Sequence, residues 1–382
     1  MINVLSIGLT LINHYSSVIA YYSLIIMNTS RRTFLETTAK ISSAALVTPS
    51  VGFTILKSKP NLSDETLGHG DHTYRIQMDW GELDATTTPV NDCHEMVQDS
   101  QGRIVLLTNE TKNNIIIYDK SGKLLNKWTN NYRGAHGLTL WNEGGEDFLY
   151  ITDLASHKVY KTTMDGKVVM QLDYPQDSGL YLEENQYFPT ETAIAPNGDI
   201  YVTDGYGLQY VFQYDAGGNL KHVFGGLGSD VSQFSERWTA HGVCIDERAK
   251  ADEPTLLIAD RNGNQFKRFS MDGKYISTIS IPGAFVSRPV IKGNNLYTAV
   301  LNSEHPWSVS DSGFVSILDE NDKVVSNPAA NSPKYVDGKL EPLRQTVKVF
   351  RHPHDVCIDD DENLYVAQWN SGRTYPIKLM RV

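Results

Sequence analysis

Apolar and polar residues alternate in short runs along most of this chain, and turns rich in Asp, Asn and Gly separate the runs. One unit recurs: an apolar, β-branched run, a second run that ends near Thr-Asp, and a third run before a hairpin of the Asp-x-x-Gly-Lys type. Alternation with a period of two predicts β-strands, and the glycine turns predict hairpins. The region from 70 to 382 carries no long amphipathic helical pattern, so we expect an all-β fold rather than an α/β fold.

Six copies of the unit follow one another, at a spacing typical of four-stranded propeller blades. They begin at His94, His136, Thr190, His241, Arg288 and His354, and the fifth is the most degenerate. The sixth copy stops after about three strands, so the ring needs a strand from elsewhere. The alternating segment from 72 to 80 is the candidate, and closing the ring would remove exposed sheet edges. We therefore predict a six-bladed β-propeller over residues 61–382.

The first 60 residues are predicted to direct export. Ser30-Arg31-Arg32-Thr33-Phe34-Leu35 resembles the twin-arginine export motif, and a moderately apolar stretch from 41 to 55 follows it. Such a signal starts a few residues upstream, which makes Met27 a candidate first residue. The alternative is a membrane anchor over residues 2–26, which its Ser and Tyr content makes a mediocre one. We expect a periplasmic protein without stable membrane association after signal removal.

The composition and net charge of the chain limit the classes of molecule that it is expected to bind. With 40% hydrophobic residues the chain can bury a core, and its net charge of −11 argues against nucleic acid and anionic membranes as partners. The three cysteines cannot form a complete disulfide framework. Cys244 and Cys357 are predicted to pack inertly in the core, whereas Cys93, next to His94, is kept as an alternative ligand.

Three histidines share one position of the repeat: His136 in Ala-His-Gly-Leu, His241 in Ala-His-Gly-Val and His354 in Pro-His-Asp-Val. In a circular fold, equivalent positions face a common axis. Three imidazoles with an open fourth position form a catalytic zinc site, although other first-row divalent metals accept the same ligands. Any one of these residues alone could be a satisfied polar side chain near the channel mouth. His94 occupies the same position in the first copy. It is predicted to line the channel as a catalytic base or a ligand, and the alternative is a structural role.

The surroundings of these histidines resemble the lyase half of the peptidyl-glycine amidating enzyme, an NHL-type six-bladed propeller. The likeness covers most of residues 90–382 in the right order. It rests on Ala135-His136-Gly137-Leu138, the run from 150 to 161, Phe188-Pro189-Thr190, the run from 202 to 206, Ser232-Gln233-Phe234, the run from 259 to 263 and the run from 352 to 356. It implies an enzyme with this fold.

Residue by residue, the resemblance implies that His136, His241 and His354 bind zinc. Tyr206 would be the catalytic base or would move the proton, and Arg261 would hold a substrate carboxylate. Both have simpler alternatives, because Tyr206 could fill the core and Arg261 could neutralise the aspartate before it.

The resemblance also implies calcium, bound by Asp355 and by backbone carbonyls near Leu138 and Met96. The chain departs from the family in three ways. Asn109 stands where the family has a second functional arginine, and an amide cannot replace the charged fork of a guanidinium. The cysteine pairs that form the family's disulfides are missing, and His94 is an additional histidine.

A metal that binds a carboxylate or hydroxyl oxygen, beside a positioned Tyr or His, supports elimination chemistry. We therefore predict a metal-dependent lyase acting on a small anionic substrate, and uronic-acid oligosaccharides are the class expected first because of Asn109 and the expected compartment. The first alternative is cleavage of peptidyl-hydroxyglycine to an amide and glyoxylate, although residues 1–90 show no copper-ligand pattern of a hydroxylating partner domain.

Two further classes stay open. NHL propellers include non-catalytic binding modules, which have no need of three histidines in phase. A lactone or ester hydrolase on a calcium-centred propeller would place Asp, Asn and Glu at the axis instead of His.

Overall fold

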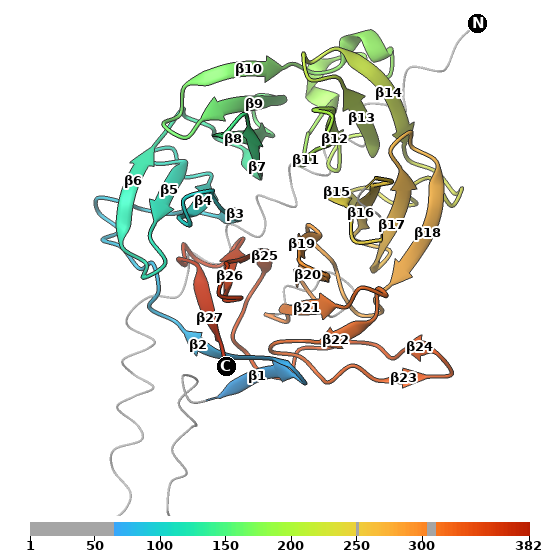
Figure 1. Ribbon diagram of the computed structural model, residues 1–382. Coiled ribbons are helices and arrows are strands. Elements are labelled where there is room, and N and C mark those ends of the chain that lie inside the picture. Colours follow the sequence, from blue (N-terminus) through green and yellow to red (C-terminus); the bar gives the residue numbers. More distant parts are fainter. Residues whose placement is uncertain (1–64, 250–251, 304–310) are drawn as a thin grey trace, which may run out of the picture. The chain divides into compact units, whose positions relative to one another are not determined.

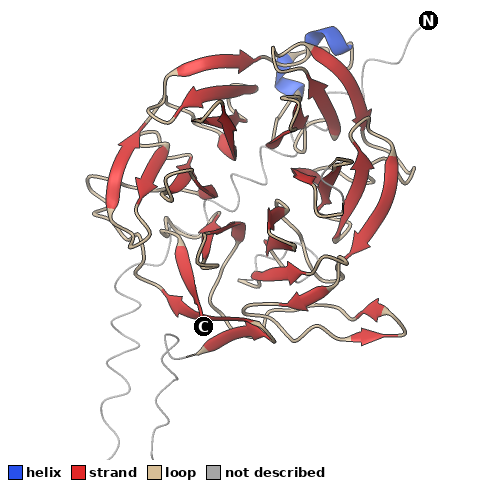
Figure 2. Ribbon diagram, in the orientation of Figure 1, coloured by secondary structure: helices blue, strands red, loops and turns tan. Residues whose placement is uncertain are grey.

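Residues 65–249, 252–303 and 311–382, which the computed structural model describes, form six antiparallel sheets around one axis and one small hairpin (Figures 1 and 2). The predicted all-β, six-bladed propeller is therefore confirmed. The twin-arginine motif and Met27 lie outside the described residues, so export and the domain boundary near residue 60 stay predictions. Among the described residues, no helix has the length and apolar character needed to cross a membrane.

Each of the first five blades contains four strands, and the first strand lies nearest the axis (Figure 1). Blade 1 consists of β3 (Cys93–Gln98), β4 (Ile104–Thr108), β5 (Ile115–Tyr118) and β6 (Leu124–Trp128). Blade 2 consists of β7 (Ala135–Glu143), β8 (Glu146–Asp153), β9 (Lys158–Thr163) and β10 (Val168–Leu172). Blade 3 consists of β11 (Glu191–Ile194), β12 (Ile200–Thr203), β13 (Tyr210–Tyr214) and β14 (Leu220–Gly225), and the 3-10 turns η2 (Gln176–Ser178) and η3 (Glu184–Gln186) precede it.

Blade 4 consists of β15 (Ala240–Asp246), β16 (Thr255–Asp260), β17 (Gln265–Ser270) and β18 (Tyr275–Ser280). Blade 5 consists of β19 (Val290–Lys292), β20 (Asn295–Val300), β21 (Phe314–Leu318) and β22 (Val324–Ser326), and the hairpin of β23 (Tyr335–Val336) and β24 (Lys339–Leu340) follows it. The inner and outer strands of blade 5 are only three residues long, which agrees with its degenerate sequence.

Blade 6 closes the ring with strands from both ends of the propeller sequence. Its order is β25 (Pro353–Ile358), β26 (Leu364–Gln368), β27 (Ile377–Arg381), β2 (His72–Gln77) and β1 (Thr66–His69). Tyr74 of β2 lies opposite Arg381 of β27. The segment predicted to complete the last blade therefore does so, and β1 adds a fifth strand.

Apolar side chains of neighbouring blades fill the space between the sheets. All five residues of β4 and all four of β5 are buried, because both faces of these strands are covered. Their sequences are continuous apolar runs, which is typical of fully buried strands. The alternation expected from the sequence is found in rim strands such as β18, where one face meets solvent.

The Asp that ends a second strand fixes the start of the inner strand of the same blade. Asp153 Oδ1 accepts a hydrogen bond from Gly134 N (2.7 Å), and Asp204 has the corresponding place in blade 3. Asn109 does the same in blade 1, where its Oδ1 accepts from Asp92 N (3.0 Å). In blades 1–3 this residue therefore sets the position of the chain that leads into the inner strand.

Candidate active site

The four repeat histidines each occupy the second residue of an inner strand. His94 lies on β3, His136 on β7, His241 on β15 and His354 on β25. The pairing register of each strand shifts at its histidine. Such bulges turn a side chain out of the regular pleat and are common beside active sites. All four side chains therefore converge at the axis.

Glycine follows two of these histidines because the neighbouring inner strand comes too close for a side chain. A Cβ atom on Gly137 would lie 2.5 Å from the carbonyl oxygen of Thr190, and one on Gly242 would lie 2.6 Å from Cα of Arg288. The His-Gly pairs in the sequence thus serve the packing of the axis.

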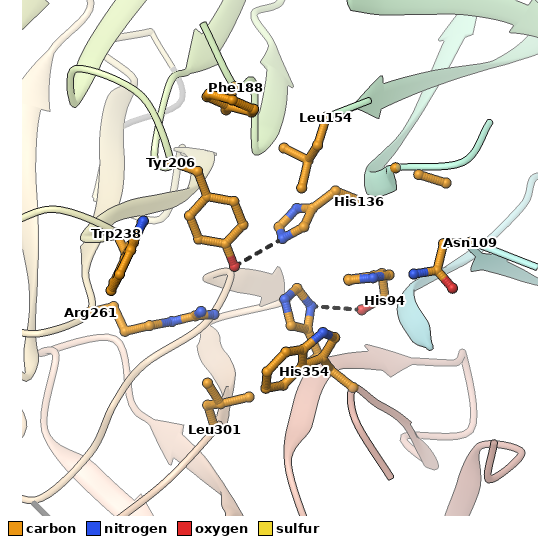
Figure 3. A pocket seen from close by; sticks show the side chains of 13 residues that line it. His94, Asn109, His136, Leu154, Phe188, Tyr206, Trp238, Arg261, Leu301 and His354 are labelled. Carbon is orange, nitrogen blue, oxygen red and sulfur yellow. Dashed lines mark hydrogen bonds between the residues drawn. The ribbon is translucent and has the colours of Figure 1, made fainter. Parts of the chain in front are cut away.

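The imidazole rings form one cluster (Figure 3). The ring centroids of His94, His136 and His354 are 4.8–4.9 Å apart. Each ring offers one nitrogen that lies within 4.8 Å of the nitrogens offered by the other two rings. His241 joins them at 4.8 Å from His136 and 5.0 Å from His354. The structure therefore brings together the three histidines that were predicted to converge, and His94 joins them.

Hydrogen bonds set the tautomers of two rings. His136 Nδ1 donates to the carbonyl oxygen of Thr190 (2.8 Å), and His354 Nδ1 donates to that of His94 (3.0 Å), which leaves each Nε2 unprotonated. Within the described residues, His354 Nε2 and His94 Nδ1 are buried without a hydrogen-bond partner. A carbonyl behind an imidazole and a free nitrogen in front of it is the arrangement that metal-binding histidines have.

His241 differs, because side chains hold both of its ring nitrogens, whereas backbone carbonyls orient the rings of His136 and His354. Arg261 can only donate, so its Nη2 donates to His241 Nδ1 (3.1 Å) and the proton of His241 lies on Nε2. This Nε2 donates to Tyr206 Oη (3.1 Å), and Tyr206 in turn donates to His136 Nε2 (3.3 Å). The sequence predicted His241 as the third ligand and His94 as a catalytic residue, whereas this geometry favours the exchange of these two roles.

Burial keeps the imidazoles neutral. It lowers the pKa of His136, His241 and His354 well below the usual range and that of His94 to about 3, and the Arg261 charge adds to the effect. Burial raises the pKa of Tyr206, while the neighbouring guanidinium acts against that rise. Neutral imidazoles are the form that binds a metal ion.

Arg261 follows β16 and is a buried cation whose partners are neutral. Its Nε donates to the carbonyl oxygen of Val286 and its Nη2 to Ser287 Oγ, both at 3.1 Å. No carboxylate within residues 65–249, 252–303 and 311–382 forms an ion pair with it, because Asp260 pairs with Lys267 (3.3 Å) instead. The alternative role of neutralising Asp260 is therefore not supported, and an anion from outside would complete the site.

The cluster opens into a cavity of about 700 Å³ with largely apolar walls. Its walls include Leu154, Phe188, Trp238, Leu301 and Trp369, and of the described residues Arg261 alone brings a lysine or arginine side chain to it. Asn109 also lines it, but Asn91 and Asp92 hold its amide. Sequence reasoning missed the two tryptophans, although Trp238 stands only three residues before a repeat histidine.

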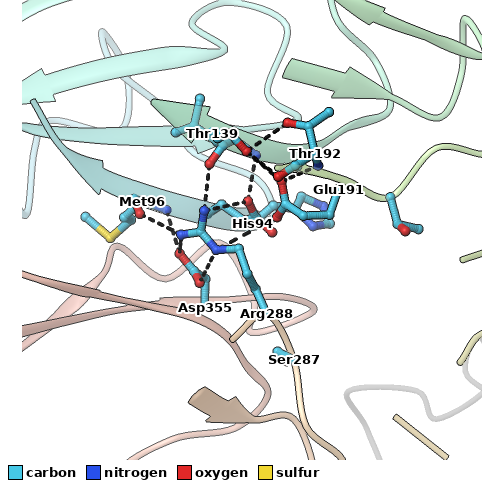
Figure 4. A network of polar contacts seen from close by, with 12 residues as sticks. His94, Met96, Thr139, Glu191, Thr192, Ser287, Arg288 and Asp355 are labelled. Carbon is cyan, nitrogen blue, oxygen red and sulfur yellow. Dashed lines mark hydrogen bonds and ion pairs between the residues drawn. The ribbon is translucent and has the colours of Figure 1, made fainter. Parts of the chain in front are cut away.

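Two sequence predictions about ligands do not fit the structure. The carbonyls of Met96 and Leu138 and the carboxylate of Asp355 all accept hydrogen bonds from Arg288, so a guanidinium stands where calcium was expected (Figure 4). Cys93 is buried among the apolar residues around Trp80 and does not belong to the histidine group. Cys357 is buried in the core as predicted. Cys244 is partly buried and packs against a second group of core residues.

No protein-family model matches the chain. A Caenorhabditis elegans protein described as a probable peptidyl-alpha-hydroxyglycine alpha-amidating lyase is 27% identical over 254 residues, which cover 64% of this chain and 64% of that protein. Peptidyl-alpha-hydroxyglycine alpha-amidating lyase 1 of Drosophila melanogaster is 26% identical over 281 residues, covering 67% of this chain and 46% of the fly protein. The matched region thus spans less than two thirds of either relative.

The comparisons with solved structures support the fold alone. The gluconolactonase of Xanthomonas campestris aligns with a TM-score of 0.53 and 12% identity, over 85% of this chain and 99% of that one. A third sequence relative, the human NHL repeat-containing protein 3, is 24% identical over 208 residues, which are 52% of this chain and 57% of that protein. The chain is therefore a six-bladed propeller whose sequence is similar to an NHL-repeat protein and to two peptidyl-alpha-hydroxyglycine alpha-amidating lyases.

Proposed function

We propose that the protein is a metal-dependent lyase that breaks a bond at the carbon next to a substrate carboxylate. One observation carries the proposal: three buried imidazoles whose nitrogens lie close together share a pocket with a buried arginine that pairs with no carboxylate of the described residues. A binding module would have no need of both features in one pocket. The similarity to two lyases supports the same class of function.

His94, His136 and His354 fit the metal, since their nitrogens lie close together and are buried, and His94 and His354 each have one nitrogen without a partner among the described residues. Zinc is the first candidate, and other first-row divalent ions suit the same ligands. When bound, such an ion polarises a substrate oxygen and stabilises the negative charge that develops on it. Calcium is not part of the proposal, because Arg288 occupies its expected place.

Arg261 would bind the substrate carboxylate. Its side chain is held by Val286, Ser287 and His241, so its direction is fixed before the substrate arrives. A bound carboxylate would supply the missing negative charge, and a buried charge-assisted pair of this kind is strong. The guanidinium would also stabilise charge that spreads into the carboxylate as the bond breaks.

Tyr206 would move the proton. Its hydroxyl lies at the pocket wall and accepts a hydrogen bond from His241 Nε2, and this donor together with the Arg261 charge stabilises the phenolate form. The chain from Arg261 through His241 to Tyr206 is ordered by its donors and acceptors. His241 is thus a positioning residue for Tyr206 in this proposal.

Peptidyl-hydroxyglycine is the substrate to which the relatives point, with an amide and glyoxylate as products. Its carboxylate would meet Arg261 and its hydroxyl oxygen the metal. The apolar walls formed by Leu154, Phe188 and Leu301 would accept the preceding side chain.

Uronic-acid oligosaccharides, the class expected first from the sequence, are the second candidate here, and two features of the pocket favour them. Asn109 stands where the resemblance implies a second arginine, and Trp238 and Trp369 line the same cavity. Flat aromatic faces can pack against the apolar faces of sugar rings. Removal of the proton beside the carboxylate by Tyr206 would then expel an oxygen from the next carbon.

The deciding experiment incubates the metal-loaded protein with hydroxyglycine peptides and with uronate oligosaccharides. Glyoxylate reports the first reaction, and ultraviolet absorbance of an unsaturated uronate reports the second. Tyr206→Phe should be inactive on the true substrate, whereas His222→Ala, a change at an exposed residue of β14, should be fully active. Turnover of neither class by a protein with one bound metal would contradict the proposal and favour a binding propeller.

A further inference from the structure

Arg288 occupies the repeat position of blade 5, where four other blades carry histidine. Its side chain is buried at the axis, with 8% of the residue exposed, and it lies among the ends of inner strands from other blades (Figure 4). The sequence around Arg288 does not indicate a role for this residue, because blade 5 is the most degenerate copy of the repeat. The contacts of the Arg288 side chain identify that role.

The guanidinium makes four short contacts with three strands. Nη1 donates to the carbonyl oxygen of Leu138 on β7 (2.7 Å), and Nη2 donates to that of Met96 on β3 (3.0 Å). Nε and Nη2 form a fork with Asp355 on β25, at 3.1 and 2.7 Å. These contacts join blades 1, 2 and 6 through one rigid, planar group.

Each contact lies within two residues of a candidate metal ligand. Met96 is two residues after His94, Leu138 is two residues after His136, and Asp355 directly follows His354. Arg288 thus holds the three strands that carry the three candidate metal ligands.

The acidic neighbours tie the same strands to one another. Asp355 Oδ2 also accepts from Met96 N (2.9 Å), and Glu95 Oε2 accepts from Leu138 N (2.6 Å). Glu95 and Glu191 carboxylates lie 3.5 and 3.8 Å from the guanidinium. Glu191 follows Thr190, the residue whose carbonyl orients His136.

Three acidic side chains therefore face one guanidinium: Glu95, Glu191 and Asp355. All three residues are at most 1% exposed, so water cannot take the place of the cation. Buried acids that lose their cation are strongly destabilising, so this arrangement is stable only while the guanidinium is present.

We propose that Arg288 is a positioning residue which, as a cation built into the chain, sets the spacing of His94, His136 and His354. This inference rests on the metal site of the proposed function. It predicts that calcium has no effect on the wild-type protein, because the oxygens that would bind it already accept hydrogen bonds. It also predicts that loss of the guanidinium loosens the metal site without touching any ligand.

The test is a Co²⁺ titration followed by the visible absorption of the bound ion, which reports ligand geometry and needs no substrate. Arg288→Ala should weaken Co²⁺ binding at least tenfold. Millimolar guanidinium should restore much of the affinity by filling the space, and Ca²⁺ should do so in part, since carboxylate and carbonyl oxygens are its preferred ligands.

Arg268→Ala is the matched control. Arg268 pairs with Asp246 (2.7 Å) and Asp322 (2.8 Å) away from the histidines, so its loss should lower stability but leave Co²⁺ affinity unchanged. If Arg288→Ala does not fold, Arg288→Lys keeps the charge without the fork and should weaken binding several-fold.

Wild-type Co²⁺ affinity in Arg288→Ala, or in Arg288→Lys where alanine prevents folding, would overturn the inference. So would a loss in Arg288→Ala that guanidinium does not restore, because that is the behaviour of a residue needed only for stability. Failure of the proposed function gives a different result, in which the wild-type protein itself binds no Co²⁺.

Discussion

Two buried arginines, Arg261 and Arg288, lie near the same axis and have opposite surroundings. Arg261 is 1% exposed and contacts a carbonyl, a hydroxyl and an imidazole. Arg288 is 8% exposed and lies among three acids and two carbonyls. Within the described part of the chain, acidic side chains therefore surround Arg288, whereas none pairs with Arg261.

The difference separates a ligand site from a structural site. A buried charge is costly unless it is paired, so a cation with only neutral partners is expected where a ligand will supply the anion. A cation whose partners are complete stabilises the surrounding strands and has no capacity for a ligand. Arg261 belongs to the first kind and Arg288 to the second, and each prediction below probes this contrast.

The largest effect is expected next to Arg261. Tyr206→Phe removes only a hydroxyl group, so the fold and bound metal should remain, while the rate should fall by about 10²–10⁴, the usual share of a general base. Steady-state kinetics together with metal analysis would check this. Unchanged turnover in this variant would remove Tyr206 from the mechanism.

Stability should distinguish the two arginines next. Arg288→Met should lower the free energy of unfolding by about 3–5 kcal/mol, because the acids around it lose their cation. Arg261→Met, the matched change, should leave this free energy unchanged or raise it, because it removes a cation without an acidic partner. Urea denaturation measures both, and equal losses in the two variants would contradict the contrast.

Arg261→Lys tests the carboxylate site in the folded enzyme. Lysine keeps the charge but lacks the planar fork, so kcat/KM should fall about tenfold or more. The comparison is with Arg268→Lys, which changes an arginine remote from the pocket and should keep wild-type kinetics. Wild-type kinetics in Arg261→Lys would return that residue to a structural role.

The smallest effect concerns pH. The folded-state pKa of His354 lies below its unfolded value near 6.5, so its contribution to stability is present above that pH and is lost as the pH falls. As the pH falls from 6.5 to 5, the free energy of unfolding of metal-free His354→Gln should therefore decrease less steeply than that of metal-free wild type, by up to about 1.4 kcal/mol per pH unit. Glu95 and Asp204, whose raised pKa values act in the opposite sense, are present in both proteins and cancel. Parallel stability profiles would show that His354 is not held neutral.

Much of the fold could be predicted because the repeat marks its own boundaries. The blade starts, the turns and the strand from 72 to 77 follow from alternation and glycine turns, and the repeat phase brings His94, His136, His241 and His354 together. Export and the periplasmic location stay predictions, since the residues that carry them are outside the described part of the chain.

The roles within the cluster could not be predicted, because they depend on contacts between distant segments. Arg288 meets Leu138 and Met96 across 150 and 192 residues of sequence, and no periodic pattern connects them. The tautomer of His241 depends on a single donor from Arg261. The calcium site implied by the resemblance does not fit for the same reason, since the resemblance identifies the oxygens of Met96, Leu138 and Asp355 but not the guanidinium that they contact.

The most direct test of the account is the metal content of four purified histidine variants after loading with Zn²⁺ and dialysis. Wild type should keep about one equivalent, His94→Ala, His136→Ala and His354→Ala should keep almost none, and His241→Ala should keep the metal while losing activity. Retention by His94→Ala with loss in His241→Ala would restore the triad expected from the sequence alone. Absence of bound metal in the wild-type protein would contradict the metal site itself.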